Sequence, residues 1–168
     1  MLSSFERLPN PLAPVDKTIS TIAGNGIEDE DFTEGAVATN SPLIKPFSLA
    51  INDEEELLVS TGKSAKFVVK IGKDGHLLKV AGNGVVAFSG DGSPAVDASL
   101  GDDIRITIGK DGEVFIADTA NDRIRMINSS GIISTIAGDG KEEYAGDGGP
   151  AIEASFTSPK CVNVASNG

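Results

Sequence analysis

Two aspartates flanked by glycines are the first candidates for chemistry in this sequence. Asp91 and Asp147 occupy the same place in the strings GDGSPAVDASL at 90–100 and GDGGPAIEASF at 146–156. Carboxylate oxygens bind calcium, which needs six to eight oxygen ligands, and nearby acidic residues could add one or two. The competing interpretation is a glycine turn in which the aspartate bonds to its own backbone. We favour the second interpretation, because that is the common use of aspartate in turns.

A second group of polar residues follows a short apolar run at 114–117. It contains Asp118, Asn121 and Arg123. Aspartate and asparagine commonly bond to backbone amides in turns, which predicts a structural role for the first two, with Arg123 paired to Asp118 or to a neighbouring repeat. The alternative is a polar cluster that faces a ligand. A structural role is also predicted for the glycines of the two Gly-Asp-Gly turns, which are Gly90, Gly92, Gly146 and Gly148.

Few other side chains in the sequence are reactive. The one histidine, His76, excludes a site built from several imidazoles. The one cysteine, Cys161, cannot form an intramolecular disulfide and is predicted to be structural. We therefore assign no catalytic and no cofactor-binding residue. Calcium at Asp91 or Asp147 is the only metal considered.

Composition and charge narrow the class of protein. The chain has 168 residues, of which 39% are hydrophobic, and this predicts a folded protein. Lys and Arg number 14 against 25 Asp and Glu, a net charge of -11. That charge disfavours nucleic acid and anionic membranes, which are bound largely through basic side chains. No apolar stretch is long enough to span a membrane, no secretory leader pattern is present, and the cellular location stays open.

An internal repeat organises the elements that carry these residues. The string Ser-Thr-Ile-Ala-Gly at 20–24 returns at 134–138, with a weaker copy at 79–84, and the glycine-rich strings follow the same period. Apolar and polar residues alternate between turns rich in Gly, Asn, Asp and Ser, which is typical of strands. The strands predicted for the first unit are 47–51, 57–60, 67–71 and 77–81. Those predicted for the second unit are 104–108, 114–117, 123–127 and 132–137.

Four-stranded units repeated at this period predict an all-β fold, a β-propeller of four-stranded antiparallel blades. We expect residues 1–16 to be an irregular lead-in and residues 17–168 to be a partial propeller. Its parts would be the end of a blade at 17–24, full blades at 43–82 and 100–138, and the start of a further blade at 156–168. Two and a half blades are too few for closure. The chain is therefore expected to be a piece of a longer propeller whose exposed apolar blade faces promote self-association.

The segment Val-Phe-Ile-Ala-Asp-Thr-Ala-Asn-Asp-Arg-Ile-Arg at 114–125 resembles the NHL repeat. The Ala-Gly-Asp-Gly and Gly-Asp-Gly-Gly-Pro-Ala segments resemble the extended form of that repeat in bacterial NHL proteins and teneurins. The resemblance covers roughly residues 17 to 168. It implies a propeller, usually six-bladed, that binds protein, RNA or small ligands. Related six-bladed enzymes include lactonases and amidating lyases, and the lyases use histidine metal ligands that His76 alone cannot match.

Two functions follow from these observations. The first is a non-enzymatic propeller segment that acts as a scaffold for a protein partner, since the acidic charge disfavours RNA. The alternative is a fragment of a metal-dependent six-bladed hydrolase or lyase whose catalytic residues lie outside this chain. A third possibility is a gene-model fragment with no function of its own. The flanking coding sequence would discriminate between them, through further repeats with channel-facing histidines or through neighbouring interaction domains.

Overall fold

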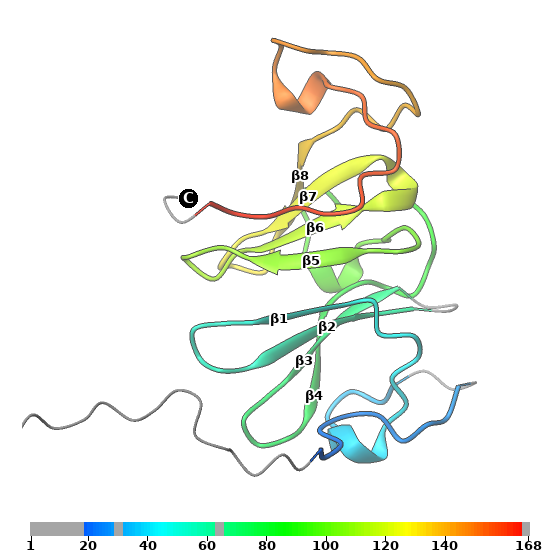
Figure 1. Cartoon of the computed structure of the whole chain (residues 1–168), viewed down its shortest axis with the longest axis vertical. Coiled ribbons are helices and arrows are strands. Elements are labelled where there is room, and N and C mark those ends of the chain that lie inside the picture. Colours follow the sequence, from blue (N-terminus) through cyan, green and yellow to red (C-terminus); the bar gives the residue numbers. More distant parts are fainter. Residues whose placement is uncertain (1–18, 29–31, 63–65, 166–168) are drawn as a thin grey trace, which may run out of the picture.

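The computed structural model describes residues 19–28, 32–62 and 66–165 and contains two four-stranded antiparallel sheets (Figure 1). The first sheet consists of β1 (Ser48–Ile51), β2 (Leu57–Thr61), β3 (Phe67–Ile71) and β4 (Leu77–Ala81). The second consists of β5 (Arg105–Ile108), β6 (Val114–Asp118), β7 (Arg123–Ile127) and β8 (Ile133–Ala137). The strands of each sheet pair in chain order, so the predicted all-β class and the two antiparallel meanders are confirmed. The predicted lead-in at 1–16 lies outside the described residues.

The two sheets follow the same plan down to an irregularity in strand pairing. The register between β3 and β4 shifts at Val68 and Val69, and the register between β7 and β8 shifts at Ile124 and Arg125. Such a bulge bends a strand and increases its twist. The matching residues are separated by the same 56 positions that separate the glycine-rich strings of the sequence. The sequence period is therefore also a period of backbone structure.

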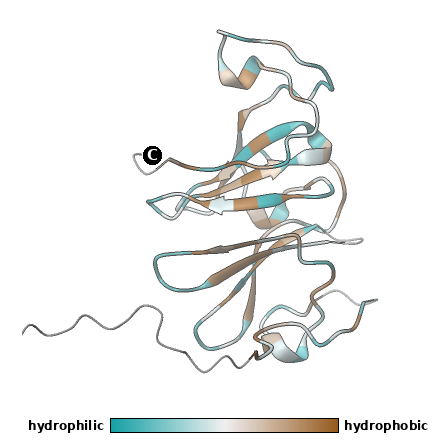
Figure 2. Ribbon diagram, viewed as in Figure 1, coloured by the Kyte–Doolittle hydropathy of each residue, from teal (hydrophilic) through white to brown (hydrophobic). Residues whose placement is uncertain are grey.

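The sheets pack face to face, with β1 and β2 against β5 (Figure 1). Because side chains alternate across a strand, Leu58 of the first sheet and Ile106 and Ile116 of the second enter one buried core. A buried serine links the two backbones, since the hydroxyl of Ser60 donates to the carbonyl of Ile104 at 2.9 Å. Figure 2 shows the apolar residues along the strands of both sheets and the polar residues at the turns.

Three connection loops, defined as residues 33–41, 90–98 and 146–154, each contain a short 3₁₀ turn. The turns are η1 (Ala38–Asn40), η2 (Ala95–Asp97) and η4 (Ala151–Glu153), and a fourth, η3 (Thr119–Asn121), lies between β6 and β7. The loop at 33–41 is a third copy that the sequence pattern did not reveal, because it lacks the Gly-Asp-Gly-x-Pro residues of the other two.

Within the described ranges, no helix has the length and apolar character needed to cross a membrane.

The first two connection loops pack on the fourth strand of the sheet that follows them. The N–H of Ala38 donates to the carbonyl of Gly75 and the N–H of Ala95 donates to the carbonyl of Gly131, both at 2.8 Å. Ala38 and Ala95 are buried by this contact. The equivalent Ala151 is exposed, because η4 packs against β8 of the sheet before it and the described residues include no later sheet on whose fourth strand it could pack.

The strands expected at the two ends of the partial propeller do not form within the described residues. Residues 19–24 and 156–165 belong to no ladder, since a strand is held by hydrogen bonds to a neighbour and neither segment has a strand beside it to pair with. The second segment lies against the turn that follows β6, where the N–H of Ser158 donates to the carboxylate of Asp122 at 2.7 Å and the hydroxyl of Thr119 donates to the carbonyl of Pro159 at 2.8 Å. Cys161, which lies on this segment, is exposed.

Candidate functional site: the Arg125 cluster and the inter-sheet groove

The carboxylate of Asp118 organises the polar turn that follows β6. One oxygen accepts a hydrogen bond from the N–H of Gly101 at 2.8 Å, and the other accepts one from Nδ2 of Asn121 at 2.9 Å. The side chain is fully buried. Burial raises the pKa of Asp118 above its ordinary value, in spite of those two bonds and the nearby charge of Arg125. Asp118 and Asn121 are thus both engaged in holding the chain segments around this turn.

The guanidinium of Arg125 joins β7 to the second connection loop. It is completely buried. It donates to the carbonyls of Ser89 and Ser99 at 2.8 and 3.0 Å and to the carboxylate of Asp91 at 2.8 Å, and it lies 3.7 Å from Asp118. We call these five residues the Arg125 cluster. Because Ser89 and Ser99 flank the loop at 90–98, the cluster fastens both ends of that loop to the second sheet.

Arg123 does not make the predicted pair with Asp118. Its guanidinium donates instead to the carbonyls of Asn121 and Asp139, both at 2.8 Å, and lies over the ring of Phe88, 3.8 Å from the ring centroid. The oxygens of Asp118 are already occupied by a backbone N–H and by Asn121. Arg123 and Arg125 look alike in the sequence. Only Arg125, which the sequence did not mark as a candidate, is buried in the core.

The two calcium candidates lie in different surroundings. Asp91 is bound to Arg125. Burial opposes its ionisation, but the nearby polar groups of Thr135 and the hydrogen bond and charge of Arg125 outweigh that effect and place the pKa of Asp91 below its ordinary value. Asp147 is exposed and accepts a hydrogen bond from the hydroxyl of Tyr144 at 3.1 Å. Among the described residues neither belongs to a group of three possible metal ligands, and calcium binding stays a prediction.

Gly90 and Gly146 stand where a side chain would not fit. A Cβ on Gly90 would lie 2.7 Å from Cα of Ala98, and a Cβ on Gly146 would lie 2.7 Å from Cα of Ala154. Both residues also have positive φ angles, 90° and 94°, which favour glycine. Two other turn glycines have positive φ angles with open space around them, and these are Gly92 and Gly148.

Replacing Gly90 by alanine is expected to lower the free energy of unfolding by about 2–4 kcal/mol, because the new Cβ both overlaps Ala98 and must adopt a left-handed conformation. Gly92→Ala is the matched control in the same loop. It has only the conformational cost, about 1–2 kcal/mol. Urea unfolding of the two variants measures the difference, and equal losses would contradict the close approach at Gly90.

Asp91→Asn is expected to remove part of the acid sensitivity of the fold. The folded pKa of Asp91 lies below the ordinary value of 3.8, so its charge contributes stability that is present above that value and is lost as the pH falls through the folded pKa. The advantage of the wild type over Asp91→Asn should therefore be constant near neutral pH and shrink below about pH 4. Urea midpoints measured across this range give the result.

The difference between the wild type and Asp91→Asn is interpreted with Asp118 in mind and with one control variant. Asp118, whose raised pKa has the opposite effect on stability, is present in both proteins, so only the part of its titration that changes with Asp91 through the shared Arg125 enters the difference. Asp147→Asn is the control at the equivalent position, where no arginine is bound, and its difference from the wild type should be small at every pH. A wild-type advantage that widens in acid would overturn the role assigned to the Asp91–Arg125 pair.

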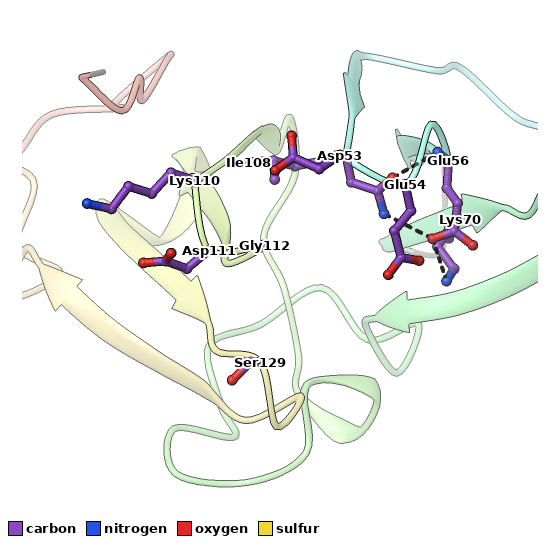
Figure 3. A pocket seen from close by; sticks show the side chains of 11 residues that line it. Asp53, Glu54, Glu56, Lys70, Ile108, Lys110, Asp111, Gly112 and Ser129 are labelled. Atoms are coloured by element: carbon purple, nitrogen blue, oxygen red, sulfur yellow. Dashed lines mark hydrogen bonds and ion pairs between the residues drawn. The ribbon is translucent and has the colours of Figure 1, made fainter. Parts of the chain in front are cut away.

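A groove opens between the sheets at the end where the β1–β2 and β5–β6 turns lie (Figure 3). Its outer part has a volume of about 590 Å³ and continues into an inner part of about 300 Å³, with Asn52, Lys70, Ile108, Gly112 and Ser129 lining both. We call this cavity the inter-sheet groove. Its floor consists of apolar side chains from both sheets, which are Leu58, Val80, Ile108, Val114 and Ile127.

One wall of the inter-sheet groove carries an ordered ion pair. Oε2 of Glu56 accepts from Nζ of Lys70 at 2.8 Å and from Nδ2 of Asn52 at 2.9 Å. The hydrogen bond from Lys70 is the main cause that lowers the pKa of Glu56 below its ordinary value. The carboxylates of Asp53 and Glu54 extend from the same turn and are exposed (Figure 3). The sequence alone did not indicate that the acidic run at 53–56 would line a cavity.

Comparison with known proteins does not place the chain in a family. The sequence matches no protein-family model and no curated protein. The NHL resemblance therefore stays a hypothesis that depends on the residues at 114–125 and on the internal repeat.

Proposed function

We propose that the two sheets are neighbouring blades of an NHL-type β-propeller and that the chain is a non-enzymatic scaffold for a protein partner. Propeller blades are copies of one four-stranded unit packed face to face. The shared bulge, the shared strand order and the three connection loops support that interpretation. The Arg125 cluster supports the scaffold interpretation, because the buried charges of Arg125 and Asp118 hold a loop in place and leave the exposed turns for recognition.

One observation carries the blade proposal. Leu49 and Ile51 of β1 hold the same places in the first sheet as Ile106 and Ile108 hold in the second, as their cross-strand partners show. Ile106 is 6% exposed because the first sheet covers it, whereas Leu49 and Ile51 are 63% and 70% exposed. We call the surface around Leu49 and Ile51 the open face. A further sheet of the same kind would cover it, as the first sheet covers the second.

The open face is expected to make the isolated chain self-associate, because exposed apolar patches promote association. Sedimentation velocity over a wide range of concentrations should show larger species as the concentration rises. The double variant Leu49→Lys/Ile51→Lys should remain monomeric. The control Leu78→Lys/Val85→Lys introduces the same charge at exposed apolar residues outside the open face, and it should associate as the wild type does. A wild type that is monomeric throughout would overturn the prediction.

The scaffold function can be tested by selection with random peptides. A phage-displayed library is selected on the purified chain, with bare resin as the control surface. We expect enriched peptides that bind saturably to the chain in solution. Failure to enrich any such peptide would contradict the scaffold. Turnover of a lactone or ester by the purified chain with added calcium would contradict the non-enzymatic part of the proposal.

A further inference from the structure

We propose that the inter-sheet groove is the docking site for a short peptide segment of a partner protein, one in which a lysine or arginine stands beside a branched aliphatic side chain. The proposal rests on the scaffold function above and adds the place and the chemistry of recognition. Its first support is shape. A cavity of about 590 Å³ that continues inward is of the size that proteins use to enclose small ligands or side chains.

The apolar floor of the inter-sheet groove favours binding of an apolar group. Leu58, Val114 and Ile127 form its deepest part and are only 3%, 6% and 3% exposed, whereas Val80 and Ile108 are half-buried and reach the cavity. Covering the half-buried pair removes apolar surface from water, which favours association. A branched aliphatic side chain is the amino-acid group that fits such a floor.

The acidic rim of the inter-sheet groove favours binding of a cation. Asp53 and Glu54 extend from the β1–β2 turn beside the cavity (Figure 3). Asp111 and Lys110 line the opposite side of the cavity, and Lys70 is bound to Glu56 at 2.8 Å, so the lining carries four carboxylates against two ammonium groups and is acidic on balance. The net charge of -11 adds a long-range attraction for basic segments. Charge complementarity at the rim and apolar burial at the floor therefore select one kind of segment, in which a basic residue neighbours an aliphatic one.

A fluorescent peptide tests the proposal directly. The probe is a labelled decapeptide with a central Lys-Leu-Lys-Ile sequence between glycine and serine residues, and binding is followed by fluorescence anisotropy on the full chain. We expect saturable binding that Asp53→Lys/Glu54→Lys weakens about tenfold, since two exposed attractions become repulsions. The control Asp147→Lys/Glu153→Lys makes the same change in net charge at exposed residues far from the groove, and it should leave the affinity within about twofold.

Two altered peptides separate the floor from the rim. A peptide with glutamate in place of lysine and a peptide with serine in place of leucine and isoleucine should both fail to bind. In methyl NMR spectra, the probe should shift the signals of Val80 and Ile108. Equal weakening by the two double variants, or shifts confined to other methyl groups, would overturn the proposal, because binding would then be non-specific attraction or would lie elsewhere.

The random-peptide selection distinguishes this failure from failure of the scaffold function. Selected peptides that bind the wild type and Asp53→Lys/Glu54→Lys equally would leave the scaffold standing and overturn the role of the inter-sheet groove. An absence of any selected binder, together with no binding of the probe, would overturn both.

Discussion

Replacing Arg125 by valine should lower the free energy of unfolding by about 3–5 kcal/mol, the range found when one partner of a buried ion pair is removed. The guanidinium makes hydrogen bonds to two carbonyls and to Asp91, and it lies beside the buried carboxylate of Asp118. Without it, the buried acid Asp118 loses the guanidinium that lies 3.7 Å away, and the carbonyls of Ser89 and Ser99 lose their donor. Buried polar groups without partners are costly.

Urea unfolding measures this loss of stability. Two further variants serve as a control and as a test of compensation. Arg105→Val removes a partly exposed pair with Asp103 and should cost less than about 1 kcal/mol. The double variant Arg125→Val/Asp118→Thr copies the first sheet, where Val69 and Thr61 occupy the equivalent places, and it should be more stable than Arg125→Val alone. A loss for Arg125→Val no larger than that for Arg105→Val would contradict the structural role of the Arg125 cluster.

The second large effect is expected at Ile106. Ile106→Ala should cost about 2–5 kcal/mol, because the side chain is 6% exposed and lies in the core between the sheets, where truncation leaves a cavity. Leu49→Ala is its counterpart in the first sheet and makes nearly the same chemical change. Leu49 is 63% exposed in the single chain, so at concentrations low enough to keep the chain monomeric we expect a change within about 0.5 kcal/mol.

Thermal or urea unfolding of the two alanine variants compares equivalent positions of one repeat in two environments. Equal losses would mean that Leu49 is covered in solution, either by association of the chain or by another part of it. Repeating the measurement with Leu49→Ala in the background of Ile51→Lys separates these outcomes, because the charge blocks association at the open face.

The sequence was most informative where local chemistry decides local structure. Alternating residues and turns rich in Gly, Asn and Asp located the eight strands found among the described residues, since these signals depend on neighbours in the chain. Predictions that need a distant partner were weaker. Residues 19–24 and 156–165 have strand-like sequences but form no ladder, because pairing is decided by what lies beside a strand.

The candidate sites also differ in whether neighbouring or distant residues decide them. The close approach at Gly90 accompanies a turn string that the sequence displays plainly. Arg125 escaped notice because the groups that accept its hydrogen bonds are 26 to 36 residues away, and nothing adjacent to it distinguishes it from Arg123. The inter-sheet groove is formed by two turns whose proximity depends on how the sheets pack, and no pattern within either turn contains that information.

Val69 and Arg125 occupy the same backbone position in two otherwise similar sheets, and this difference makes the two halves of the molecule respond to different conditions. Val69 lies in an apolar cluster with Ala38 of the first connection loop, and such contacts weaken on cooling. The second connection loop is held partly by the Asp91–Arg125 ion pair, which weakens in acid as the carboxylate takes up a proton. Cold should therefore loosen one loop and acid the other, so that a protein built from repeats of a single unit acquires local openings that can be triggered separately.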